Sequence, residues 1–222
     1  QHKKKKMASV NKKKIIICIN NLSTGGSEKQ VSYIANFFSE YYSVKLFLLE
    51  KKKINYKISK NIEIIQSKYF LAVVFQYILE LIKNKFTLIF FFLPKSYLVF
   101  GILSLFVNKR KKIMFRRSLN YYQNKNYVLK KIEIFLHNFT GHFIANSFAA
   151  RNELIKFEKI KANSTDVVYN FIEPVSFSGQ KKIVKSKNFL CTANFYKYKN
   201  HKLILETLYY FNKYEKNWRL FL

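Results

Sequence analysis

A pair of adjacent glycines, Gly25 and Gly26, has the clearest chemical meaning in this sequence. An apolar run at 15–19 leads into the pair, and a helix-like pattern starts directly after it. Glycine lets the backbone approach a ligand at a distance where any Cβ would clash. The helix that starts there also directs unpaired N–H groups and the positive end of its dipole at the same place. The turn therefore predicts a phosphate or sugar-phosphate site in a nucleotide-dependent α/β enzyme.

Polar and cationic side chains follow other apolar runs. Asn146 and Asn170 each stand at the end of one such run, and Arg116 and Arg117 end another. In open parallel sheets, ligands bind beyond the carboxyl ends of the strands. We therefore treat these four residues as candidates for a cleft, where the arginines would suit an anionic substrate. Helix capping beside Ser147 or a plain turn is the alternative for the asparagines, and a surface position is the alternative for the arginines.

Several kinds of catalytic site are excluded or unsupported by the residues present. Asp166 is the single aspartate, so a metal-binding Asp-x-Asp site cannot be formed. The sequence contains neither a P-loop motif nor the Gly-x-Gly-x-x-Gly fingerprint of dinucleotide binding. His137 and His142 are too far apart for a metal pair on one helical turn, and no cysteine lies near them. We therefore expect no metal site.

Apolar, strand-like runs alternate with segments of helical periodicity along the whole chain. Continuous apolar strands separated by helices predict a parallel sheet covered on both faces, and right-handed crossovers make it Rossmann-like. The expected helices include one containing Val31, Ile34, Ala35 and Phe38, one capped by Ser147 and one after 200. The expected strands are 15–20, 44–49, 62–65, 87–92, 111–115, 142–146, 165–169 and 188–193.

The same pattern predicts four parts of the chain. Residues 1–14 form a basic disordered tail, and 15–172 form a Rossmann-like domain. Residues 173–187 contain proline, glycine, serine and lysine without apolar periodicity, which indicates a linker. Residues 188–222 start a second Rossmann-like unit with a strand, a turn, a helix and a further apolar run.

The formal net charge of +29 is extreme for 222 residues. It indicates either a polyanionic partner, such as nucleic acid or an anionic membrane, or a bias toward A/T-rich codons. The positive charge comes almost entirely from lysine, whereas sequence-specific readers of nucleic acid favour arginine. Nucleic acid is therefore the less favoured partner, and a basic protein that binds nucleic acid or anionic membrane is the alternative function.

Residues 86–107 are long and apolar enough to be considered as a membrane span. Pro94 and Lys95 fall in the middle of this segment, where a charge is costly. A strand at 87–92, a Pro-Lys-Ser turn and a helix at 96–107 explain the segment better. Cys18 and Cys191 lie in apolar runs and are expected to be buried free thiols, as in a reducing cytoplasm.

Four segments, in order, resemble the family-four glycosyltransferases of the GT-B fold. Residues 20–29 are similar to the strand, Gly-Gly-(Ala/Ser)-Glu turn and helix that open the family's N-terminal lobe. Residues 143–147 resemble its Ala-Asn-Ser strand end, and residues 166–172 resemble its Val-Ile-Tyr-Asn-Gly-Ile segment. Residues 192–201 resemble the first turn of its C-terminal lobe, including the Lys-Asn-His ending.

The resemblance implies a retaining sugar transferase that needs no metal ion or cofactor. Its donor would be a UDP- or GDP-linked sugar, and its acceptor a glycan or lipid-linked glycan used for surface polysaccharide. By the match, Lys199 neutralises the donor diphosphate, Gly25 and Gly26 line the cleft beside it, and His201 is a further cleft candidate. Asn194 stands where the family often has arginine for the diphosphate.

The resemblance also predicts a fragment. The family's paired-glutamate motif has no counterpart in the 222 residues, so the catalytic residues are unassigned and the chain alone is expected to be inactive. We expect it in the cytoplasm, peripherally bound to the inner face of an anionic membrane.

Overall fold

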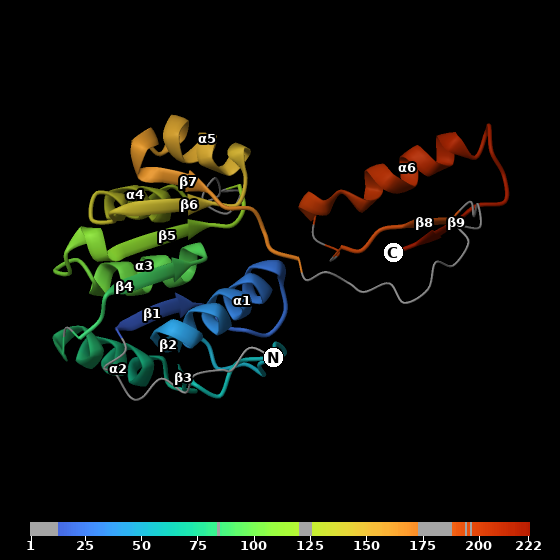
Figure 1. Cartoon of the computed structure of the whole chain (residues 1–222). Helices are drawn as coiled ribbons and strands as arrows, with labels where there is room; N and C mark the ends of the chain where they lie inside the picture. Colours follow the sequence, from blue (N-terminus) through green and yellow to red (C-terminus); the bar gives the residue numbers. More distant parts are fainter. Residues whose placement is uncertain (1–12, 84, 120–125, 173–187, 194, 196) are drawn as a thin grey trace, which may run out of the picture. The chain divides into compact units, whose positions relative to one another are not determined.

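The computed structural model describes residues 13–83, 85–119, 126–172, 188–193, 195 and 197–222. The chain divides into two units, 1–172 and 173–222 (Figure 1). The expected tail and linker fall mostly outside the described residues, and so does Asn194.

The first unit is built on a parallel seven-stranded sheet with the order β3-β2-β1-β4-β5-β6-β7. Register is continuous between neighbours; for example, Ile17 of β1 pairs with Leu46 of β2 and with Phe90 of β4. The strands are β1 (Lys14–Ile19), β2 (Ser43–Leu48), β3 (Ile62–Ile65), β4 (Leu88–Phe92), β5 (Lys112–Arg116), β6 (His142–Ala145) and β7 (Thr165–Val167). The helices are α1 (Gly26–Tyr41), α2 (Phe70–Lys83), α3 (Pro94–Leu103), α4 (Tyr127–His137) and α5 (Phe148–Phe157), with short 3-10 turns η1 (Lys109–Lys111) and η3 (Ala162–Ser164).

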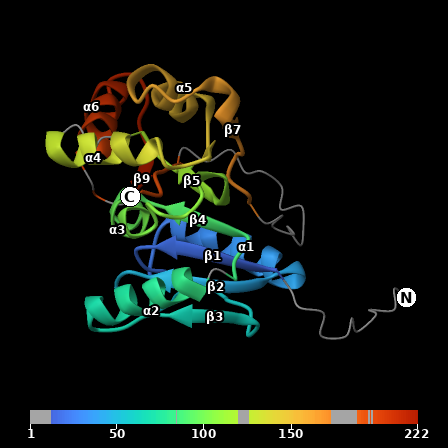
Figure 2. The ribbon, with the colours of Figure 1, turned by 90° about the vertical axis from the view of Figure 1, so that its left-hand side faces the viewer.

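The alternation of side chains along the central strands creates two cores, one on each face of the sheet. Ile16 and Cys18 of β1 join the core under α2, α3, α4 and α5, whereas Ile15 and Ile17 join the core under α1. Figure 2 shows α1 on the side of the sheet opposite α2 and α3. Because both faces are covered, the strands are continuous apolar runs, which confirms the predicted Rossmann-like α/β fold.

The second unit repeats the beginning of the same architecture. The parallel strands β8 (Asn188–Leu190) and β9 (Arg219–Phe221) are joined through the 3-10 turn η4 (Lys197–Lys199) and α6 (His201–Phe211). Phe189 contacts the rings of Phe211 and Trp218, so the small sheet and its helix share an aromatic core.

Some expectations about the elements were wrong. The Pro-Lys-Ser turn does not exist, because Pro94 starts α3 and the turn is made by Leu93 at a φ of +67°. Proline is well suited to the first position of a helix, since its missing N–H would have no intrahelical partner there. The helix also ends at Leu103 rather than at 107, and α2 was not anticipated. Cys18 is buried as expected, but Cys191 is only half-buried.

Within the residues that the structure describes, no helix has the length and apolarity needed to cross a membrane. The segment 86–107 instead forms β4, α3 and the turn that follows.

Candidate functional site

The glycine turn lies at the carboxyl end of β1 and has a geometry that only glycine adopts easily. Gly25 has a φ of +143°. Its N–H donates to the hydroxyl of Tyr56 at 2.8 Å, and this hydroxyl donates to the carbonyl of Gly25, also at 2.8 Å. A Cβ on Gly25 would lie 2.3 Å from Oε2 of Glu28. A Cβ on Gly26 would meet nothing within 4 Å. Gly25 is therefore required by the fold of the turn, whereas the space at Gly26 is open.

Glu28 changes the electrostatics of this turn. Its carboxylate lies in the first turn of α1, where it accepts a hydrogen bond from its own backbone N–H. Burial raises its pKa, while that hydrogen bond and Lys52 oppose the rise. The positive end of the helix dipole therefore already faces an acidic side chain. An incoming phosphate would meet like charge here, whereas a sugar hydroxyl could donate to the carboxylate.

A second carboxylate, that of Glu50, follows the carboxyl end of β2, and Lys52 acts on it as well as on Glu28. Glu50 accepts hydrogen bonds from Nζ of Lys95 at 2.5 Å and from Nδ2 of Asn21 at 3.2 Å. The hydrogen bond from Lys95 is the main cause that lowers the pKa of Glu50, and Lys52 adds to it. This edge of the sheet therefore alternates acidic and basic side chains above the ends of β1 and β2.

Three of the predicted residues come together at the ends of β5, β6 and β7. Asn146 donates from Nδ2 to the carbonyl of Arg117 at 2.8 Å, and the guanidinium of Arg117 donates from Nη2 to Oδ1 of Asn170. Arg117 is half-buried, and burial lowers its pKa to about 10, so it stays charged at neutral pH. Its Nε has no hydrogen-bond partner among the described residues. These contacts place one cation, whose guanidinium donates to Asn170 and whose backbone is held by Asn146, at the edge where parallel sheets bind ligands.

The segment after β7 is attached to α1. Gln30 of α1 donates from Nε2 to the carbonyl of Phe171 at 2.6 Å and accepts from its N–H at 2.8 Å. The ring of Tyr33 packs edge-on against the ring of Phe171 at 5.2 Å. Helix α1 thus holds Phe171, the residue after Asn170, and connects the glycine turn with the segment that follows β7.

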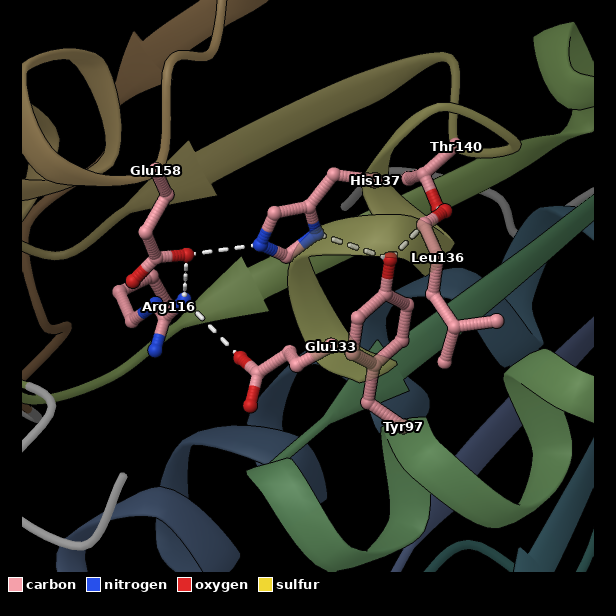
Figure 3. Close-up of polar contacts among 7 residues, drawn as sticks. All are labelled: Tyr97, Arg116, Glu133, Leu136, His137, Thr140 and Glu158. Carbon is pink, nitrogen blue, oxygen red and sulfur yellow. Dashed lines mark hydrogen bonds and ion pairs between the residues drawn. The ribbon is translucent and has the colours of Figure 1, made fainter. Parts of the chain in front are cut away.

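Arg116 does not face a cleft, contrary to the prediction. Its side chain is 3% exposed and lies among α4 and the end of α5 (Figure 3). Its Nη2 lies 3.0 Å from Oε1 of Glu133 and 2.5 Å from Oε2 of Glu158. A cation neutralised in this way is unavailable to a substrate, so Arg116 is a structural residue.

A histidine completes this buried charge cluster, which we define as Arg116, Glu133, His137 and Glu158. His137 contacts Oε2 of Glu158 through Nε2 at 2.7 Å and the hydroxyl of Tyr97 through Nδ1 at 3.1 Å. Burial raises the pKa of Glu133 to about 7 and lowers the pKa of His137. Both shifts favour neutral groups, which reduces the charge enclosed beneath the helices.

Sequence analysis missed this cluster, although Glu133 and His137 have the four-residue spacing that places two side chains on one helix face. Ligand atoms of Glu133, His137 and Glu158 lie within 4.8 Å of one another, a separation that a metal ion could bridge. The guanidinium of Arg116 already contacts both carboxylates. A positive group is therefore supplied by the chain itself at the place where an ion would bind.

The predicted donor residues of the second unit lie at the start of α6. Lys199 ends η4, and Asn200 follows with a left-handed φ of +50° as the N-cap of α6. His201 stacks on the ring of Phe195 at 4.7 Å, and its Nε2 has no hydrogen-bond partner among the described residues. The strand, turn and helix expected around Lys199 are thus present, while its role toward a ligand stays a prediction.

Comparison with solved structures shows which fold these units form. The chain aligns with HepE from Anabaena, solved in complex with UDP-glucose, with a TM-score of 0.68 and 16% identity over 93% of this chain and 59% of that one. The fold is GT-B-like. A putative UDP-N-acetylglucosamine 2-epimerase from Listeria monocytogenes aligns with a TM-score of 0.54 and 8% identity over 94% of this chain and 61% of that one.

This chain spans about three-fifths of the length of these GT-B-like structures. No known family model matches the sequence, and no curated protein sequence matches it either. Membership of the family-four glycosyltransferases therefore stays a prediction.

Proposed function

We propose that this protein transfers a sugar from a UDP- or GDP-linked donor to a glycan or lipid-linked acceptor in surface polysaccharide biosynthesis. The observation that carries the proposal is the gathering of Gly25, Arg117, Asn146 and Asn170 at one edge of a GT-B-like sheet. A parallel sheet brings all strand ends to one edge, so the support comes from the contacts that join Asn146 to Arg117 and Arg117 to Asn170 there. HepE, which shares the fold, was solved with UDP-glucose.

The acceptor side of the proposed site is the carboxyl edge of the first unit. Glu28 offers a carboxylate next to Gly25 in the glycine turn, and a carboxylate accepts hydrogen bonds from sugar hydroxyls. Arg117 offers a half-buried, charged guanidinium at the same edge. A polyhydroxylated acceptor that also carries negative charge, such as a lipid-linked glycan phosphate, matches these groups.

The donor side of the proposed site is the start of α6. Departure of a nucleoside diphosphate needs positive charge and N–H donors at the leaving oxygens. Lys199 supplies an ammonium directly before the N-terminus of α6, where Asn200 makes no side-chain cap hydrogen bond. We propose that this pair takes the role that a metal ion has in metal-dependent transferases, with retention at the anomeric carbon.

The first test is nucleotide binding to the 222-residue chain, measured by ligand-observed NMR with UDP, GDP and UDP-glucose. We expect Lys199→Gln to weaken binding about tenfold, because a charge-assisted hydrogen bond to phosphate contributes about 1.5–3 kcal/mol. Lys202→Gln is the matched control, since Lys202 lies in the same helix start, is highly exposed and pairs with Glu206. Equal binding of UDP and ADP, or equal effects of the two substitutions, would contradict the proposal.

The second test separates transfer from other nucleotide-sugar chemistry. Incubation with a UDP-sugar and a lipid-linked acceptor should give a glycosylated lipid and free UDP when the chain is complemented by any segment it needs. An epimerised UDP-sugar with no free UDP would instead assign a 2-epimerase reaction, the one for which the Listeria protein is named.

A further inference from the structure

Helix α2 is apolar on the side that faces solvent as well as on the side that faces the sheet. Val73, Tyr77 and Leu81 are buried against the strands. The opposite side carries an apolar stripe at helical spacing, formed by Leu71 (75% exposed), Phe75 (62%), Leu79 (39%) and Ile82 (69%). An apolar helix face that is not packed against the sheet is normally enclosed by protein or by lipid. Within the described residues of the first unit, nothing encloses this stripe.

Exposed lysines flank the helix at both ends. Lys68 precedes α2, Lys83 is its last residue and Lys85 follows it. Lys68 also lines a shallow pocket of about 510 Å³ together with Lys51, Lys52 and Lys53. The stripe therefore has lysines at both ends.

The one acidic residue between 66 and 87 is turned away from this surface. Glu80 is 3% exposed and lies under the helix, where Lys45 binds its Oε2 at 2.9 Å and Lys14 binds its Oε1. Hydrogen bonds from these two lysines outweigh burial and keep its pKa below the usual value. Within α2 itself, no exposed acidic side chain therefore lies beside the stripe, and the exposed Glu63 of β3 is paired with Lys45.

We propose that α2 docks the protein on an anionic lipid bilayer, with the apolar stripe at the boundary between head groups and acyl chains. Interfacial helices combine large apolar side chains on one face with lysines beside them, and Tyr69, 77% exposed, adds a ring suited to the head-group level. A second copy of the chain fits less well, because it would bring the same lysines together. An anionic bilayer neutralises them and covers the stripe at once.

The inference rests on the part of the proposed function that brings the protein to a lipid-linked acceptor, and it names the surface that does so. Its test needs no nucleotide and no sugar transfer. If UDP does not bind, the result of the vesicle experiment is unaffected. If the chain does not bind vesicles, the result of the nucleotide experiment is unaffected.

The first experiment is flotation of the full chain with phosphatidylcholine vesicles, with and without phosphatidylglycerol. We expect binding to the anionic vesicles, and a loss of at least about tenfold in the combined variant Leu71→Gln, Phe75→Gln and Ile82→Gln. The matched control is Tyr127→Gln, Val128→Gln and Phe135→Gln on α4, whose side chains are similarly exposed. We expect the control to bind within about twofold of the unchanged chain, since all lysines are kept in both variants.

Three results would overturn the proposal. These are equal binding of the α2 and α4 variants, complete release of the unchanged chain by salt alone, and a dimer without vesicles that the α2 substitutions abolish. Circular dichroism of both variants verifies that the fold is kept.

The second experiment measures insertion directly and does not depend on removing apolar groups. The chain has one tryptophan, Trp218, which contacts Phe189 in the second unit. In a Trp218→Phe background, a Phe75→Trp substitution places the single indole on the stripe. Quenching of its fluorescence by brominated acyl chains is the expected result, and unquenched fluorescence on bound vesicles would refute insertion.

Discussion

The two consecutive arginines at the end of β5 have opposite environments. Arg116 is enclosed with Glu133 and Glu158 beneath the helices, whereas Arg117 lies half-buried at the carboxyl edge and donates to Asn170. Successive side chains of a strand point to opposite faces, so Arg116 shares a face with Met114, under α4 and α5. An arginine at a strand end is therefore buried or exposed according to the face of the sheet to which its side chain points. On the buried face, carboxylates from the covering helices pair with it.

The largest expected effect is the loss of stability when the buried Arg116 is replaced. Arg116→Met leaves two carboxylates buried without a cation, which costs about 3–5 kcal/mol when one partner of a buried pair is removed. Urea unfolding monitored by circular dichroism measures the loss. Arg110→Met is the control, because Arg110 is exposed in η1 and its replacement should cost less than about 0.5 kcal/mol. A loss below about 1 kcal/mol for Arg116→Met would show that the cluster is not a closed ionic network.

The two glutamates of the cluster should differ in importance. Glu158 accepts at 2.5 Å from Arg116 and contacts His137 at 2.7 Å. Glu133 forms an ion pair with Arg116 at 3.0 Å, but its oxygens have no partner with hydrogen-bond geometry among the described residues. We expect Glu158→Gln to cost about 2–3 kcal/mol and Glu133→Gln less than about 1 kcal/mol at pH 8. The comparison of the two unfolding curves is the measurement, and a reversed order would mean that Glu133 is the main partner of Arg116.

Sequence patterns predicted the sheet well because its strands are buried on both faces. Each expected strand begins within about one residue of the observed one, and Ser147 caps α5 by accepting from the N–H of Ala150 at 3.2 Å, as predicted. Helix α2 was missed although its apolar residues recur at helical spacing, and large apolar side chains lie on its outward face as well as on its inward face.

The site was predictable only in part, for a physical reason. Asn146 and Asn170 follow strands directly, and the topology of a parallel sheet brings all strand ends to one edge. The buried cluster, in contrast, needs Arg116, His137 and Glu158 from three different elements to meet. No short spacing encodes such a meeting, and only the Glu133–His137 pair had a local signal.

The pH dependence of stability should sharpen the account of the cluster. The folded-state pKa of Glu133 is about 7, above the usual unfolded value, so the folded chain holds a proton that the unfolded chain releases. Its stabilising contribution is complete below the unfolded pKa and is lost as the pH rises through about 7. The lowered pKa of His137 acts in the opposite direction, since stability is lost as the pH falls below its unfolded value.

The variant Glu133→Gln isolates the first of these effects, because His137 is kept. The free energy of unfolding of the variant minus that of the unchanged chain should increase between pH 5 and pH 8. Urea unfolding across this range measures the difference. A difference that stays constant with pH would mean that Glu133 is ionised in the folded protein throughout.

The smallest expected effect on stability, and the most informative one for function, belongs to Arg117. Its partner Asn170 is exposed, so Arg117→Gln should cost no more than about 1 kcal/mol. If the carboxyl edge binds an anionic glycan acceptor, the same substitution should weaken that binding about tenfold, since a charge-assisted hydrogen bond is lost. Asn170→Ala keeps the charge of Arg117 but removes the hydrogen bond that positions its guanidinium. It should therefore weaken acceptor binding less than Arg117→Gln does. Calorimetric titration of a phosphorylated lipid-linked glycan measures both, and an unaffected affinity would mean that Arg117, like Arg116, only holds the ends of the strands together.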